Sequence, residues 1–419
     1  AAGYAGPPGP AMSTSPGPGA PRIVCIGGGT GLPVLLRGFH AQLDREHPSP
    51  GPPHPELLTG IVAVSDDGGS SGRIIDQYGT LPPGDIRNCV LALADPQVGS
   101  VIRRFFDHRF AEGDEELAGH SAGNLLILAL SQVNQGDFRK TILDVARIFS
   151  IHDQILLPTL QPTLLGARLA DGSEVLGESK IPVRRNGAPI ERVFLRRRDD
   201  PQAPLEAMPE AVEAIRHADA VVLAPGSLYT SLLPNLLVPE IGQAWRETRA
   251  LRIYVCNLVT EVGETDGYTV EDHVEALWRH LGCWPEVALV NRVPPSDSSL
   301  RRYAFDGFRL DWQVAREEID ELLDGLQRGG AFRTPDAGTV ERIQARVLFL
   351  REKAARLHGQ QIAVGRRPDG PALPTRLVEA DLAEEVEIQD RGIRKRVLRH
   401  SPEAVVAAIG QLLRERTAG

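Results

Sequence analysis

The sequence predicts an α/β protein built on a Rossmann-like, doubly wound parallel sheet in a three-layer α/β/α arrangement. Short runs of β-branched and other apolar residues alternate along the chain with segments of helical periodicity. Glycine-rich turns follow the first two of these runs, at residues 27–31 and 68–72. Glycines placed between a strand and a helix are typical of the ligand-binding edge of such a sheet.

Five apolar runs have the length and composition of buried strands, and they are residues 22–26, 57–65, 220–223, 252–256 and 287–290. Leu32, Leu35, Leu36 and Phe39 follow the first run at helical spacing, so the chain opens with a strand, a turn and a helix. Residues 86–160 are mainly helical in pattern. The stretch of about residues 165–200 interrupts the alternation and predicts a small antiparallel β insertion.

The same patterns divide the chain into four parts. Residues 1–20, rich in glycine and proline, predict a disordered tail, and residues 21–310 predict the α/β domain. Residues 311–372 carry two amphipathic helices and predict a helical-hairpin insertion whose role the sequence leaves unknown. Residues 373–419 predict a strand and a last helix that complete the domain, with Ser401 as the N-cap of that helix.

Composition excludes several classes of function. The chain has 46 Lys plus Arg against 55 Asp plus Glu, a formal charge of -9, so no general electrostatic attraction recruits nucleic acid. Its four cysteines show no paired spacing, which argues against a disulfide framework or a structural zinc site and fits a reducing cytoplasm. No apolar run approaches the roughly 20 residues that a membrane-spanning helix needs.

The first candidate site is the turn Gly27–Leu32. Backbone N–H groups at a helix start can hold an anion when glycine removes the side-chain bulk, and this involves Gly28, Gly29, Thr30 and Gly31. The dinucleotide pattern G-x-G-x-x-G would need glycine where Leu32 stands, and no Walker lysine follows, which disfavours NAD and P-loop chemistry. A tight turn with no ligand is the alternative.

The second candidate is the segment SDDGGSSGR, residues 65–73, after the second strand. Asp66 and Asp67 could bind Mg²⁺ or ribose hydroxyls. The hydroxyls of Ser70 and Ser71 could bond phosphate oxygens, and Arg73 could pair with a phosphate through two hydrogen bonds. A solvated turn would have a similar composition.

Two further candidates open helices. Asp85 has the position of an N-cap, which alone would explain it, while Arg87 and Asn88 in the first turn are placed for an anion or a nucleotide ring. Asn124 closes the segment GHSAGN, which contains G-x-S-x-G. The residues before it, EGDEELA, do not form the strand that a serine-hydrolase elbow requires, so that chemistry is disfavoured.

The last two candidates follow the third and fourth strands. Gly226, Ser227 and Thr230 repeat the chemistry of the first turn, and two anion cradles in one sheet suit a ligand containing a diphosphate. In the segment 257–269, Thr269 and Asp272 predict a capping box for a helix that begins near Val270. Other polar residues of that segment could meet sugar or ribose hydroxyls, and they are Asn257, Glu261, Glu264, Thr265 and Asp266. His273 is expected to be structural.

Together these segments resemble the YvcK/CofD-like family, most closely its YvcK branch. The resemblance rests on GGGTGLPVLLRG, VAVSDDGGSSGR, PPGDIRNCVLAL, GHSAGNLLI, APGSLYTSLLPNLL and NLVTEVGETDGYTVEDHV, in that order between residue 22 and about residue 291. It resumes at Arg302-Tyr303 and at residues 397–402, so residues 311–372 look like an insertion relative to the family.

The resemblance implies a Rossmann-like fold and a function in binding UDP-sugars, notably UDP-N-acetylglucosamine, with a role in gluconeogenic growth, cell-wall synthesis and cell shape. The CofD branch instead transfers a phospholactyl group from a guanylylated donor with Mg²⁺, but the forms SDDGGSSGR and PPGDIRN are typical of YvcK. By this resemblance the nucleotide-sugar cleft is lined by Gly28 to Gly31, Asp66, Asp67, Gly226, Ser227 and Asn257. Tyr303 and Arg399 would contact the ligand from the C-terminal side.

The expected function is therefore that of a cytoplasmic regulator that binds a UDP-sugar and requires no cofactor. The alternative is a Mg²⁺-dependent transferase acting on a nucleotide diphosphate donor, with Asp66 and Asp67 as metal ligands. A third class is a scaffold that docks partners through the segment 311–359. The expected partners are the UDP-sugar and a protein of unknown identity, without nucleic acid. The sequence leaves open whether the ligand is sensed or consumed, and whether the chain forms a homodimer.

Overall fold

The computed structural model describes residues 20–46, 57–94, 100–110, 117–182, 184, 188–302, 338–341, 343–344, 347, 364–367, 373–390 and 393–418. Most of the predicted tail at 1–20 and of the predicted hairpin at 311–372 lies outside these residues. Of the hairpin segment, residues 338–341, 343–344 and 347 are helical.

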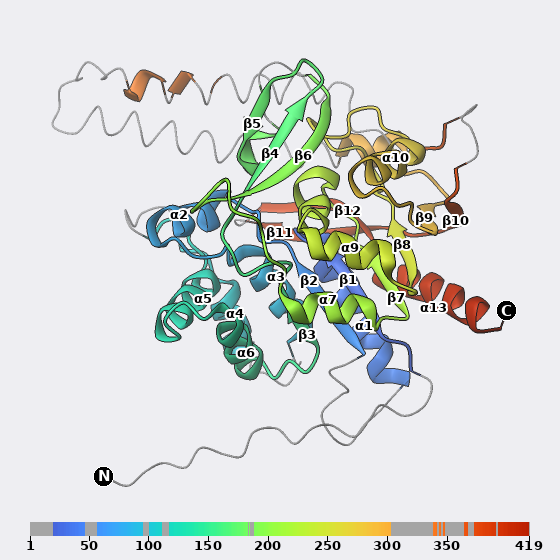
Figure 1. The fold of residues 1–419 in the computed structure, drawn as a ribbon, viewed down its shortest axis with the longest axis horizontal. Coiled ribbons are helices and arrows are strands. Elements are labelled where there is room, and N and C mark those ends of the chain that lie inside the picture. The colour runs from blue at the N-terminus through green and yellow to red at the C-terminus, as the bar shows by residue number, and fades with distance from the viewer. Residues whose placement is uncertain are drawn as a thin grey trace, which may run out of the picture.

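A seven-stranded parallel sheet forms the centre of the molecule and confirms the predicted fold class. Its strands run in the order β10-β9-β8-β7-β1-β2-β3 (Figure 1). Their bounds are β1 Ile23–Gly27, β2 Leu58–Val62, β3 Gln154–Leu156, β7 Ala220–Leu223, β8 Leu251–Val255, β9 Val287–Asn291 and β10 Arg376–Ala380. All five predicted strand runs lie in this sheet. The edge strand β3 falls in the stretch expected to be mainly helical, since three residues are too few to show a period.

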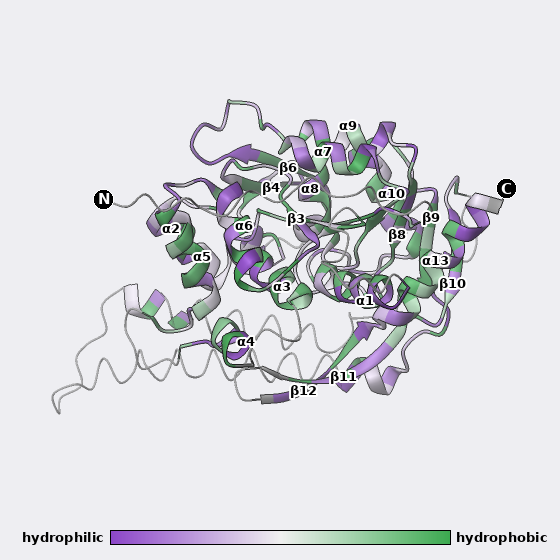
Figure 2. Ribbon diagram, turned by 90° about the horizontal axis from the view of Figure 1, so that it is seen from below, coloured by the Kyte–Doolittle hydropathy of each residue, from purple (hydrophilic) through white to green (hydrophobic). Residues whose placement is uncertain are grey.

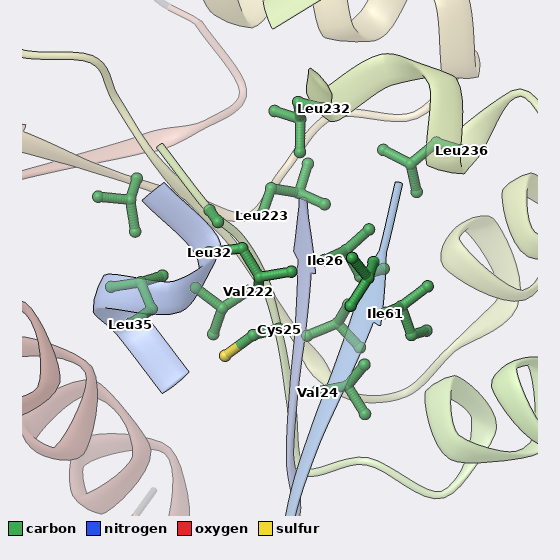
Figure 3. Close-up of a cluster of buried hydrophobic side chains, with 14 of the residues drawn as sticks. Val24, Cys25, Ile26, Leu32, Leu35, Ile61, Val222, Leu223, Leu232 and Leu236 are labelled. Carbon is green, nitrogen blue, oxygen red and sulfur yellow. The ribbon is translucent and has the colours of Figure 1, made fainter. Parts of the chain in front are cut away.

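Both faces of the sheet are covered, which explains why its strands read as continuous apolar runs. Every residue of β1, β2 and β7 is buried. Figure 3 shows Cys25 on the side of β1 where Leu32 and Leu35 of helix α1 lie, while Val24 and Ile26 point to the other side.

Helices form the outer layers. In Figure 2, α7 and α9 lie on one side of the sheet, and α1 lies on the other together with the strands β11 and β12. The helices are α1 Gly31–Glu46, α2 Gly69–Tyr78, α3 Gly84–Leu93, α4 Ser100–Asp107, α5 Ala122–Val133, α6 Phe138–Ile148, α7 Pro209–Arg216, α8 Leu233–Leu236, α9 Pro239–Glu247, α10 Val270–Leu281 and α13 Pro402–Ala418. Helix α10 begins with the predicted capping box of Thr269 and Asp272.

Two antiparallel sheets accompany the central one. A three-stranded sheet of order β5-β4-β6 projects from the body at the top of Figure 1, with β4 Thr163–Leu169, β5 Glu174–Leu176 and β6 Ile190–Arg197. The second is the ribbon of β11 Ala383–Asp390 and β12 Ile393–His400. The predicted strand and last helix of this region correspond to β10 and α13, and the ribbon between them was not predicted. Charged residues fill both strands of the ribbon and obscure the alternation of Val386 and Ile388.

The chain returns to the sheet through residues 364–367. The amide of Val364 donates to the carbonyl of Leu258 at 3.1 Å, and the amide of Val270 donates to Gly365 at 2.9 Å. The guanidinium of Arg367 pairs with Asp272 at 2.6 Å and with Glu275 at 3.3 Å. This segment is therefore fixed beside the first turn of α10.

Within the described part of the chain, no helix combines the length and the apolar composition that crossing a bilayer requires.

The contact between α1 and the sheet gives a direct test of this packing. Leu36 is fully buried, and its side chain fills the space that Gly60 of β2 leaves open, where a Cβ would lie 2.8 Å from its Cδ1. We expect Leu36→Ala to lower the free energy of unfolding by about 2–5 kcal/mol, because the sheet cannot collapse into the cavity.

Urea denaturation followed by circular dichroism measures this loss. Leu143→Ala, at a side chain on α6 that is 53% exposed, is the control and should change the free energy by less than about 0.5 kcal/mol. Equal effects of the two substitutions would contradict the packing described.

Candidate functional site

The topological switch point of the sheet lies between β1 and β7. From β1 the sheet extends through β2 and β3 on one side, and from β7 it extends through β8, β9 and β10 on the other. When the chain leaves two neighbouring strands toward opposite faces of the sheet, a crevice opens at the carboxyl ends of those strands. The candidate site is a cavity at this position.

The cavity has a volume of about 340 Å³, at the lower end of the range for small-molecule sites. Loops after β1, β7 and β8 form it together with the end of β12. Its lining residues are Gly29, Thr30, Gly31, Val34, Pro225, Gly226, Ser227, Ser231, Asn257, Leu258, Val259, Thr260, Glu261, Leu398, Arg399 and His400.

The loop after β1 requires glycine for two physical reasons. Gly29 has φ +59°, which L side chains rarely adopt. A Cβ on Gly31 would lie 1.7 Å from the carbonyl oxygen of Pro225, so the two loops touch through their backbones. Helix α1 begins at this contact, and its first N–H groups have no partner within the helix. This end of α1 can therefore receive an anion.

The loop after β7 is held by the side chain of Asn257. Gly226 donates its N–H to Oδ1 of Asn257 at 3.0 Å, and Nδ2 of Asn257 donates to the Gly226 carbonyl at 2.8 Å. The side-chain amide of Asn257, predicted to meet sugar or ribose hydroxyls, is thus paired with the backbone of this loop. Ser227, the next residue, donates from Oγ to Oε1 of Glu261 at 2.6 Å.

A π-helical turn, Leu228–Leu232, follows this loop. The Ser227 carbonyl accepts hydrogen bonds from the amides of Ser231, at 3.0 Å, and Leu232, at 2.9 Å. The wider turn brings Ser231 to the other loop, with its Oγ 3.6 Å from where a Cβ of Gly29 would stand. Such turns are rare and concentrate at functional sites. Sequence reasoning missed Ser231, because its position depends on this local widening.

Three of the predicted contact residues lie behind the cavity. Thr230 donates to Glu264 at 2.9 Å, and the hydroxyl oxygen of Thr265 accepts the N–H of Glu261 at 2.8 Å. The side chains of these residues are buried and do not line the cavity, and they are Thr230, Glu264 and Thr265. Burial raises the pKa of the Glu264 carboxyl well above its usual range, and the nearby Glu261 raises it further. These residues shape the wall of the cavity.

Asp85 does not cap α3, which begins at Gly84 after Pro83. Its Oδ2 instead accepts the N–H of Gly29 at 2.9 Å, while Nδ2 of Asn88 donates to the Gly29 carbonyl at 3.4 Å. The two side chains thus hold Gly29 through both its N–H and its carbonyl group. A Cβ on Gly28 would also lie 2.6 Å from the Asp85 carboxylate, so the position of Asp85 requires glycine at residue 28.

Asp66 and Asp67 follow β2 and are turned toward backbone. Asp66 accepts the N–H of Gly68 at 3.0 Å. The two oxygens of Asp67 accept the amides of Glu178, at 2.9 Å, and Ser179, at 2.8 Å, and so anchor a turn of the three-stranded sheet. Among the residues the structure describes, no three His, Cys, Asp or Glu side chains converge as metal ligands. Mg²⁺ bound by these carboxylates would compete with the backbone hydrogen bonds that they accept.

Glu178 joins this acidic group from the three-stranded sheet, and no sequence signal marked it. Burial raises the pKa of Glu178 to about 8, and the charges of Asp66, Asp67 and Asp85 add to the rise. Burial, followed by the charge of Asp66, likewise raises the pKa of Asp85 to about 7.

The remaining predicted residues fall into two places. Arg399 lines the cavity from β12, beside His400, whose Nε2 donates to the Cys256 carbonyl at 3.0 Å. Ser70, Ser71, Arg73 and Asn124 lie around the starts of α2 and α5 and do not line it. Tyr303 lies outside the described residues.

Comparison with known proteins decides the family. The model of the family described as 2-phospho-L-lactate transferase CofD matches residues 23–323. The chain belongs to the CofD/YvcK family.

Its relatives support this membership. A protein named gluconeogenesis factor from Bacillus subtilis is 40% identical over 305 residues, which span 72% of this chain and 88% of that protein. One of the same name from Listeria monocytogenes is 39% identical over 328 residues, spanning 76% of this chain and 94% of the relative. A longer relative from Nostoc is 43% identical over 286 residues, but the chain spans only 58% of its length.

A solved structure agrees with the fold. The crystal structure of a UPF0052-family protein from Bacillus halodurans matches 93% of this chain and 98% of its own, with 31% identity and a TM-score of 0.65.

Asp85 makes the stability of the site dependent on pH. Its folded-state pKa of about 7 lies above the ordinary value of 3.8, so the folded protein holds this proton more firmly than the unfolded chain. The resulting stabilisation is complete below about pH 4 and is lost as the pH rises through about 7. Asp85→Asn removes this titration and keeps an acceptor for the Gly29 amide.

We expect the free energy of unfolding of the parent to fall relative to Asp85→Asn between pH 5 and pH 8, with a slope of at most about 1.4 kcal/mol per pH unit. Urea denaturation in EDTA at four pH values measures it. Gly410→Ala on α13 is the control, because it changes no charged group and its added Cβ would lie no closer than 3.4 Å to a neighbouring side chain. Parallel pH curves for the parent and Asp85→Asn would refute the assignment.

Proposed function

We propose that this protein is a cytoplasmic regulator that binds a UDP-sugar, with UDP-N-acetylglucosamine as the leading ligand, in the cavity between β1 and β7. The observation that carries the proposal is the meeting of two glycine loops at the topological switch point. Each loop precedes a helical turn, and the first N–H groups of α1, which lack partners within that helix, begin at this cavity. A diphosphate presents two adjacent anionic groups that such a pair of loops can share.

The rest of the lining suits the other parts of a nucleotide sugar. Hydroxyl and carboxylate groups of Thr30, Ser227, Ser231 and Glu261 can exchange hydrogen bonds with ribose and sugar hydroxyls. Leu258 and Val259 supply an apolar wall for a flat base. Arg399 adds a guanidinium at the β12 side, the position that the family resemblance assigns to a ligand contact.

The names of the relatives support the biological part of the proposal. Several are gluconeogenesis factors, so we place this protein in the control of growth on gluconeogenic carbon, and with it cell-wall synthesis and cell shape. A regulator of this kind binds its ligand without consuming it and acts through a protein partner.

Calorimetry tests the ligand. UDP-N-acetylglucosamine and UDP-glucose should release or absorb heat on titration into the protein, and GDP and NAD should bind more weakly or not at all. Val34 lines the cavity, so Val34→Trp should fill it and abolish the signal.

Val133→Trp, at a side chain on α5 that is 76% exposed, is the matched control and should bind like the parent. Circular dichroism checks that both variants fold. The absence of heat with either UDP-sugar at near-millimolar concentration would overturn the proposal.

The second candidate is a transferase that acts on a nucleotide diphosphate donor, favoured by the description of the family model. Mg²⁺ would then have to draw Asp66 or Asp67 away from the backbone amides that each now accepts. Product formation from UDP- or GDP-linked donors with Mg²⁺, lost in Asp67→Asn, would establish it. Intact donors after prolonged incubation would leave binding as the function.

A further inference from the structure

A second polar site lies where the first turns of three helices meet. We call it the three-helix junction, formed by residues 69–71 of α2, 84–87 of α3 and 122–124 of α5. The oxygen of Ser70 on α2 accepts a hydrogen bond from Nδ2 of Asn124 on α5, at 3.1 Å. Arg87 on α3 crosses Gly123 of α5, where a Cβ would lie 2.9 Å from its Cδ. None of these residues lines the cavity between β1 and β7.

Arg87 is a buried cation with unused hydrogen-bond donors. Its side chain is only 7% exposed, and its Nε and Nη1 find no partner in the described part of the chain. Nη2 donates to Oδ1 of Asn88 at 2.9 Å. Among the described residues no carboxylate forms an ion pair with it, although Asp85 and Asp107 act on it at longer range. A buried guanidinium in this state lacks the hydrogen bonds that normally offset its desolvation.

Asn124 adds an unused acceptor to the same junction. It is 3% exposed, and its Oδ1 has no partner among the residues that the structure describes. Because the Ser70 oxygen accepts from Asn124, the single Ser70 proton is directed to Nδ1 of His120, 2.9 Å away. His120 is then a neutral ring, in agreement with a pKa that burial and the nearby Arg73 lower. The polar groups of the junction that point to each other are satisfied, which leaves the buried open groups on Arg87 and Asn124 as the unsatisfied ones.

The surroundings of the junction are also rich in arginine. Arg73 donates to the Ala118 carbonyl at 2.5 Å and Arg109 to the Gly119 carbonyl at 3.2 Å, both on the loop that leads into α5. In the part of the chain that the structure describes, neither pairs with a carboxylate. The charge of Arg109 lowers the pKa of Arg87, which shows that the two cations repel each other. An anion between them would relieve this repulsion, against the opposing charges of Asp66, Asp85 and Asp107.

We propose that the three-helix junction binds the phosphate group of a second small ligand, held by Arg87 and Asn124. Phosphate matches both open groups, because its oxygens accept from the guanidinium while a protonated phosphate oxygen donates to Oδ1 of Asn124. A carboxylate would leave that acceptor unfilled near neutral pH. Helices α3 and α5 both begin at this junction, so the positive ends of their dipoles add to the attraction for an anion. The proposal does not depend on the nucleotide-sugar proposal, since the two sites share no residue.

Titration with inorganic phosphate tests the proposal, with ³¹P line broadening and calorimetry as readouts and sodium chloride at equal ionic strength as the reference. The titration is run in the Val34→Trp background, in which the cavity between β1 and β7 is filled, so that phosphate cannot be bound there. We expect saturable binding that Arg87→Met weakens at least tenfold. Arg139→Met, at an exposed arginine on α6 that pairs with Glu210, is the matched control and should bind phosphate as before.

The same variants separate this proposal from the one above. Without the Val34→Trp change, Asn124→Asp should bind UDP-N-acetylglucosamine like the parent, because the Asn124 side chain bonds Ser70 and not the loops of the cavity, so a failure of either site is seen independently. Absence of phosphate binding, or equal binding by Arg87→Met and Arg139→Met, would show that water fills the junction and would overturn the proposal.

Asn124→Asp keeps the shape of the junction and provides a second variant if Arg87→Met does not fold. Its added negative charge should repel phosphate and weaken binding at least tenfold. Unchanged affinity in Asn124→Asp would also overturn the proposal. Citrate serves as the carboxylate ligand, and we expect it to bind more weakly than phosphate. Tighter binding of citrate would reject phosphate as the ligand class.

Discussion

The contact between Gly31 and the Pro225 carbonyl is the constraint on which the site depends. A side chain at position 31 would have to overlap that oxygen, since its Cβ would lie 1.7 Å away. The contact joins the loops that leave β1 and β7, the two strands between which the sheet reverses its direction of growth. Asn257 and Asp85 then fix the loops from either side through Gly226 and Gly29. The cavity is therefore bounded by backbone whose position is set by packing and hydrogen bonds.

The electrostatics around this cavity are unusual for a site that we propose to bind a diphosphate. Asp66, Asp85 and Glu178 crowd together, and each has its pKa raised by burial and by its acidic neighbours. Attraction for a phosphate has to come from helix starts, backbone N–H groups and the Arg399 guanidinium. The three carboxyl groups do not line the cavity, so they act on a ligand there only through their charge.

Much of the fold could be predicted from the sequence, and the site only in part. Buried parallel strands are continuous apolar runs, so β1, β2, β7, β8 and β9 were all visible. The ribbon of β11 and β12 was not, because a two-stranded ribbon with charged faces lacks that signal. The glycine loops were found through composition alone. The roles of Asp85, Glu178 and Ser231 were missed because they depend on contacts distant in sequence, such as the hydrogen bond that the Glu178 amide donates to Asp67, or on a local π-helical turn.

The contribution of Leu398, Arg399 and His400 to the cavity has a consequence for biosynthesis. Residues 23–27 and 220–223 pair in the centre of the sheet, yet the wall that faces them comes from the end of β12. During translation the two glycine loops emerge well before that wall. A nascent or truncated chain that stops before residue 398 has the cradle but an open binding site. The wall that closes the cavity is therefore added only after the central strands have been made.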